Sequence, residues 1–100
     1  MKAVLVFREK KSLPEGGLVE IVIWRVPSNE KYPDGIKYRL AFIPAGWIQP
    51  AILYDNHHPK GPHKHIDGLE SPGLFPGVPS LKLDFLRDIA QWRAHREGLT

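Results

Sequence analysis

Apolar residues follow a helical repeat at only one place in this chain, close to its C-terminus. Leu81, Phe85, Ile89 and Trp92 recur at the spacing of one helix face, with Leu86 and Ala90 beside them. Ser80 is the expected N-cap, and the basic residues Arg93 and Arg96 and then Gly98 fit the end of a helix. The sequence therefore predicts a single helix that buries this stripe against a sheet.

The chain before this helix alternates in hydrophobicity and is divided by ten prolines and nine glycines, which keep regular elements short. Only Glu20 and Arg25 interrupt the apolar run 18–26, so we expect that strand to be central and covered on both faces. Pro50 places the fourth strand at an edge or a bulge. Short turns join the predicted strands, at residues 3–8, 18–26, 37–43 and 47–55, and a shorter extended piece follows at 62–66. The expected fold class is α+β: an antiparallel meander of four to five strands with one C-terminal helix on one face.

Composition narrows the class of protein further. Hydrophobic residues make up 42% and charged residues 25% of 100 residues, which is typical of one globular domain spanning 1–100. The absence of cysteine excludes disulfides, thiolate metal sites and thiol catalysis, and fits a reducing compartment. No signal peptide or membrane span is visible, so we expect a soluble, cytoplasmic protein. The net charge of +3 permits an anionic partner, and the basic patch Arg8, Lys10 and Lys11 is most simply a solvated hairpin end.

Four of the five histidines fall between Tyr54 and His65, in a segment that Pro59, Gly61 and Pro62 stiffen. His63 and His65 lie two residues apart, so an extended backbone places both imidazoles on one face of the strand. A solvated loop is the simplest explanation of such a cluster. A stiff loop that concentrates histidine is also suited to holding side chains for chemistry.

Two kinds of chemistry fit these residues. A borderline cation such as zinc would take His63 and His65 with Asp55 or His57 as a third ligand. RNA cleavage without metal needs a base, an acid and a cation, which two histidines and Lys60 or Lys64 provide, with Arg39 reaching in from the third strand. Binding of phosphate without chemistry uses the same residues. The residues alone leave these alternatives open, although they contain no acidic cluster for magnesium.

The sequence resembles the TumE-like family, whose members are toxins of toxin–antitoxin pairs. The resemblance covers nearly the whole chain and rests on the segments KAVLVFREKKSLPEGG, VEIVIWRVP, KYRLAFI, YDNHHPKGPHKHI and DFLRDIAQWR. It implies a growth-inhibiting toxin of a type II system, encoded beside a helix-turn-helix antitoxin that binds and silences it. The copies of the shared motif in this chain are Tyr54, Asp55, Asn56, Lys60, Gly61, His63 and His65.

The resulting hypothesis is a toxin that acts as a metal-independent endoribonuclease without a cofactor. The expected catalytic residues are His63, His65, Lys60 and Lys64, and the expected substrate contacts are Arg39, Tyr54, Asp55, Asn56 and Gly61. RNA as the target follows by analogy with other small toxin nucleases of similar layout. The competing hypotheses are a non-enzymatic module that binds nucleic acid or protein, and a divalent-metal-binding domain built on the same histidines.

Overall fold

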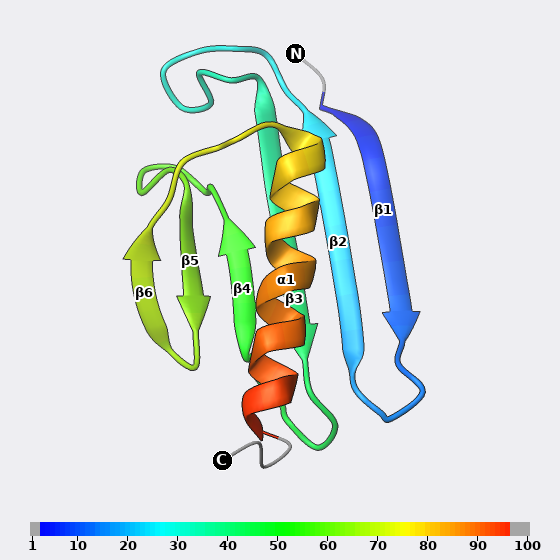
Figure 1. Cartoon of the computed structure of the whole chain (residues 1–100). Coiled ribbons are helices and arrows are strands. Elements are labelled where there is room, and N and C mark those ends of the chain that lie inside the picture. Colours follow the sequence, from blue (N-terminus) through cyan, green and yellow to red (C-terminus); the bar gives the residue numbers. More distant parts are fainter. Residues whose placement is uncertain (1–2, 97–100) are drawn as a thin grey trace.

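The chain folds into one antiparallel sheet with a single helix across one of its faces, as Figure 1 shows for this computed structural model, which describes residues 3–96. The predicted α+β architecture is confirmed, with six strands rather than four to five. The elements are β1 (Val4–Ser12), β2 (Leu18–Arg25), β3 (Ile36–Ile43), β4 (Ile52–Asp55), β5 (His63–Ile66), β6 (Leu69–Pro72) and α1 (Val78–Arg96).

The strands pair in the order in which they occur in the chain, and every neighbouring pair is antiparallel, which confirms the meander. The strand that the sequence analysis missed is β6. It pairs with β5 through a two-residue turn in which Asp67 and Gly68 both have positive φ, at 51° and 83°. Asp-Gly is a preferred pair for such hairpin turns, so this dipeptide was the available signal.

The core lies between α1 and one face of the sheet, which we call the helix-side face. The predicted stripe is confirmed, because Leu81, Phe85 and Ile89 are all buried. The helix begins at Val78, before the expected N-cap Ser80, because the Leu81 N–H already donates to the Gly77 carbonyl at 2.9 Å. Proline at position 79 is tolerated there, since the first turn needs no intrahelical donor. Gly98 lies outside the described residues.

The opposite face, which we call the open face, is not covered by any element of residues 3–96. This corrects the expectation that β2 is covered on both sides. Val19, Ile21 and Ile23 are buried beneath α1, whereas Val22 and Trp24 on the open face stay partly exposed. One helix can cover only one side of a single-layered sheet, so the apolar residues on the other side of β2 remain accessible.

The fourth strand is shorter than expected and is not at an edge. The ladder resumes at Ala51, whose N–H donates to the Phe42 carbonyl at 2.9 Å, and β4 itself begins at Ile52. Pro50, which has no N–H to donate, lies just before Ala51 and outside the strand. It belongs to the connection that follows the turn in which the Trp47 N–H donates to the Pro44 carbonyl. β4 is an interior strand between β3 and β5.

Candidate functional site

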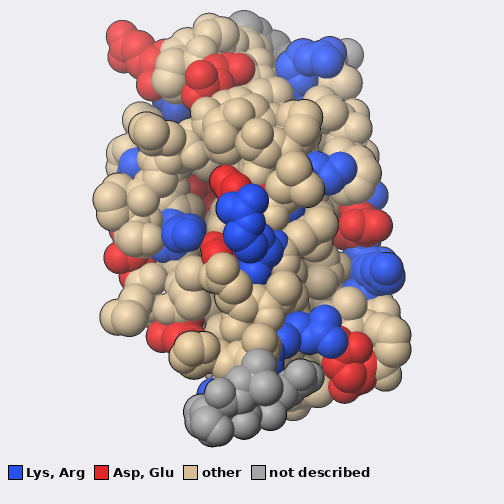
Figure 2. All heavy atoms as spheres, in the orientation of Figure 1, with Lys and Arg blue, Asp and Glu red and all other residues tan. Residues whose placement is uncertain are grey.

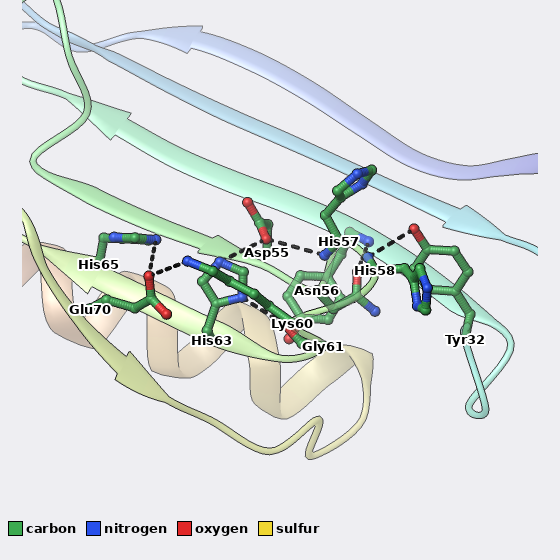
Figure 3. Close-up of polar contacts among 11 residues, drawn as sticks. Tyr32, Asp55, Asn56, His57, His58, Lys60, Gly61, His63, His65 and Glu70 are labelled. Atoms are coloured by element: carbon green, nitrogen blue, oxygen red, sulfur yellow. Dashed lines mark hydrogen bonds and ion pairs between the residues drawn. The ribbon is translucent and has the colours of Figure 1, made fainter. Parts of the chain in front are cut away.

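Two histidines and their charged neighbours gather on the open face, where β4, β5 and β6 lie side by side. Asp55 and His63 are register partners across β4 and β5, and His65 and Glu70 are partners across β5 and β6. The imidazole rings of His63 and His65 lie 5.2 Å apart between centroids. Together with Lys60 these residues form the histidine cluster, which Figure 3 shows in close-up.

His63 is the buried member of the histidine cluster, with 8% of its surface exposed. Its Nε2 lies 3.1 Å from a carboxylate oxygen of Asp55, and its Nδ1 lies 2.7 Å from the carbonyl oxygen of Gly61. Gly61 has a φ of 73°, which other residues adopt at a cost, and this turn aims its carbonyl at the ring. Both ring nitrogens therefore have protein partners, and neither is turned towards solvent.

His65 is the more accessible imidazole, and it neighbours an ion pair. Its Nε2 lies 3.7 Å from a carboxylate oxygen of Glu70, which is too long for a hydrogen bond. The Lys60 ammonium donates to the same oxygen at 2.6 Å. The hydrogen bond from Lys60 is the main cause that lowers the pKa of Glu70. His65 and Lys60 therefore both lie beside the exposed Glu70 carboxylate, but only Lys60 forms a hydrogen bond with it.

Arg39 extends the positive charge of this face onto β3. Its Cα is the register partner of Asp55, so it lies two strands away from His63, with Asp55 between them. The guanidinium is half exposed and reaches Glu20 at 3.7 Å, a distance that leaves its donors available to another anion. The structure therefore gathers Asp55, Lys60, His63 and His65 on one face of the sheet, and Arg39 lies farther along the same face.

Asn56 has a structural place in the fold. It is buried, its Oδ1 accepts from the Tyr38 N–H at 2.9 Å, and its Nδ2 donates to the Ile36 carbonyl at 2.8 Å. The last register pair of β3 and β4 is Arg39 with Asp55, so the Asn56 side chain continues the ladder where the β4 backbone leaves it. Its polar atoms are occupied by backbone, not presented to a ligand.

Tyr54 and Lys64 point to the other side of the sheet. Their backbones are register partners on β4 and β5, and both side chains contact the helix residue Asp88. The Tyr54 hydroxyl donates to the Asp88 carboxylate, and the Lys64 ammonium lies 3.2 Å from the same oxygen. Burial, and secondly this hydrogen bond, raise the pKa of Tyr54. Lys64 is therefore separated by the sheet from the histidine cluster.

A groove of about 670 Å³ adjoins this second group on the helix side. Seen from that side in Figure 2, basic and acidic side chains alternate and do not form a patch of one sign. Tyr38 lies in the wall of this groove. Burial, followed by the charge of Asp55, raises the pKa of Tyr38 to about 12. The sequence analysis missed Glu70 and Asp88 as partners, because each meets its contacts only through strand pairing or helix docking.

Two further properties of the described residues bear on function. Within residues 3–96, no three or more histidine, aspartate or glutamate side chains are grouped so that they could hold a metal ion. In the same part of the chain, no helix has the length and apolar character needed to cross a membrane.

Comparison with known proteins gives one match. A family model described as Toxin TumE matches residues 3–93. No curated protein and no solved structure matches the chain. The matched region includes all six strands, most of the helix and every residue of the histidine cluster. The chain thus belongs to the TumE family of toxins.

Proposed function

We propose that this toxin is a metal-independent endoribonuclease that acts on RNA at the open face of its sheet. The observation that carries the proposal is the accessible His65 imidazole beside the Lys60 ammonium, both next to the Glu70 carboxylate, on a face that no other described element covers. An open sheet face gives an RNA strand access to these groups. Arg39, on the same face, supplies a further cation for a phosphate.

The chemistry assigns different roles to the two histidines. His65, whose nearest carboxylate is 3.7 Å away, takes the proton of the RNA 2′-hydroxyl as that oxygen attacks phosphorus. Lys60 stabilises the developing negative charge and protonates the departing 5′-oxygen. The products are a 2′,3′-cyclic phosphate and a free 5′-hydroxyl, so the cleavage step consumes no water.

His63 is a positioning residue in this proposal. Its contacts with Asp55 and the Gly61 carbonyl tie the β4 end to the loop that carries Lys60. The same contacts occupy both nitrogens of His63 and leave His65 as the single histidine of the cluster available for proton transfer, which supports a second candidate function in which the open face binds RNA without cutting it. A toxin of either kind is consistent with inhibition by an antitoxin that covers the open face or distorts it.

Cleavage of a labelled single-stranded RNA by the purified protein separates these possibilities. We expect cleavage that persists in EDTA and leaves a cyclic phosphate end. His65→Ala should slow it by about 10²–10⁴-fold, the range of general acid–base catalysis. His95→Ala is the matched control, because this exposed histidine lies near the end of α1, away from the cluster, and its loss should leave the rate unchanged.

Three results would contradict the proposal. A folded His65→Ala protein that cuts RNA at the wild-type rate would rule out proton transfer by that residue. RNA that is bound but stays intact would favour the non-enzymatic candidate. Activity that is lost in EDTA and restored by zinc would move the histidines to the role of metal ligands.

A further inference from the structure

The outer edge of β1 is the longest unpaired strand edge in the described chain. β1 has nine residues and pairs only with β2, so the N–H and C=O groups on its other side have no strand partner within residues 3–96. The opposite edge of the sheet, β6, has four residues and ends at Pro72, which cannot donate to an added strand. Only the β1 edge is therefore long enough to template an added strand over several residues.

The side chains of β1 give this edge a positive charge. Arg8 and Lys10 face the open side, since their register partners are Val22 and Glu20, and Lys11 faces the helix side opposite Val19. Glu9 is the single acidic residue of the strand. Along the margin where Figure 1 places β1, the helix-side view in Figure 2 shows basic groups with acidic groups between them. An added strand with acidic side chains would meet complementary charge from Arg8 and Lys10 on the open side, whereas on the helix side Lys11 lies next to Glu9.

The first part of β1 adds exposed apolar surface to the same edge. Val4, Leu5 and Val6 are 52%, 43% and 43% exposed. A bulge between Leu5 and Phe7 disturbs the ladder at this point, whereas the pairing from Phe7 to Ser12 is regular. A partner segment would thus find regular main-chain groups beside the cations and an apolar contact beyond the bulge.

Pairing of β1 with a second copy of itself is disfavoured by charge. The antiparallel register that pairs all nine residues places Arg8 opposite Arg8, with the partner's Lys10 diagonal to it on the same face. Like charges directly opposite each other destabilise a strand pair. The basic side chains therefore oppose self-association but do not oppose an acidic strand.

We propose that β1 binds an extended, acidic segment of a partner protein as a seventh strand of the sheet. The inference rests on the toxin having a protein partner, as expected for a toxin silenced by an antitoxin, and not on RNA being its target. Main-chain hydrogen bonds to the β1 edge would provide affinity, and Arg8, Lys10 and Lys11 would select acidic side chains.

Amide hydrogen exchange of the full chain, resolved by NMR, tests this directly. The probe is a nine-residue synthetic peptide in which glutamate alternates with valine, and the control peptide has lysine in place of glutamate. We expect the glutamate peptide to slow exchange of the outward-facing amides of residues 4–12 at least tenfold at saturation. Lys10→Glu should weaken its binding about three- to tenfold. Lys31→Glu, an equal charge change in the exposed 26–35 loop, should not.

Several outcomes would overturn the inference. One is that the glutamate peptide at millimolar concentration does not slow exchange of the β1 amides, and another is that the lysine peptide binds as tightly as the glutamate peptide. A third is slower exchange that depends on toxin concentration without any peptide, which would indicate that β1 pairs with a second copy of itself. Protection by a short RNA oligonucleotide in place of the peptide would assign this edge to nucleic acid. Because the RNA cleavage assay is read separately on the same protein, failure here leaves the proposed nuclease function untouched, and the reverse also holds.

Discussion

Replacement of Asn56 by alanine tests whether this residue of the family motif serves the fold or the target. In the folded protein its side chain satisfies the buried Tyr38 N–H at 2.9 Å and the Ile36 carbonyl at 2.8 Å. Alanine would leave one donor and one acceptor without a partner. Each such group costs about 1–3 kcal/mol, so the free energy of unfolding should fall by about 2–6 kcal/mol.

Urea unfolding followed by tryptophan fluorescence measures this loss, since the chain has three tryptophans. For a domain of this size each kcal/mol corresponds to roughly 4–8 °C in Tm, so the thermal shift should exceed about 8 °C. His57→Ala, at the exposed neighbouring position, should change stability by less than about 0.5 kcal/mol. If Asn56→Ala does not fold, Asn56→Asp keeps an acceptor for the Tyr38 N–H, while it replaces the donor to the Ile36 carbonyl with an oxygen and adds a negative charge. Wild-type stability of Asn56→Ala together with lost toxicity would refute the structural role.

Three other perturbations address the core, the alkaline limit and the surface ion pair. Phe85→Ala should cost about 3–5 kcal/mol in urea unfolding because its ring is fully buried, whereas Leu86→Ala, at 52% exposure, should cost much less; equal losses would mean that the helix docks differently. Burial raises the pKa of Tyr38 to about 12, so the folded state binds this proton more tightly than the unfolded state does. The free energy of unfolding should therefore be fully retained below pH 10 and fall towards pH 12. In Tyr38→Phe this fall should be smaller. Glu70→Gln frees the Lys60 ammonium, so binding of a single-stranded RNA should tighten about two- to fivefold at low salt, and unchanged binding in a gel-shift assay would remove Lys60 from the RNA surface.

Much of the fold was predictable because its signals are local. The stripe of Leu81, Phe85 and Ile89 predicted the buried helix face, and alternation together with Pro-Gly turns predicted the strands and their meander. The errors also had local causes. The Asp-Gly turn that creates β6 was overlooked, and Pro50 was placed inside a strand that begins only after it.

The candidate site was predictable in part for the same reason. A spacing of two residues puts His63 and His65 on one face of any strand, and their rings do lie 5.2 Å apart. The same alternation puts Lys64 on the other face, but the sequence does not say which face the helix will cover. Helix docking decided that Lys64 faces α1 and pairs with Asp88, and that the two histidines lie on the open face.

By itself, then, the sequence determined the strands, the helix and the side on which each residue of a strand lies, because these depend on neighbours along the chain. Tertiary structure alone decided the contacts between residues far apart in sequence. Strand register set Asp55 against His63 and Glu70 beside His65, and helix docking brought Asp88 to Tyr54. Packing also buried Asn56, turning a polar motif residue into a continuation of the ladder. Such contacts depend on how whole elements pair and pack, which no short sequence pattern specifies.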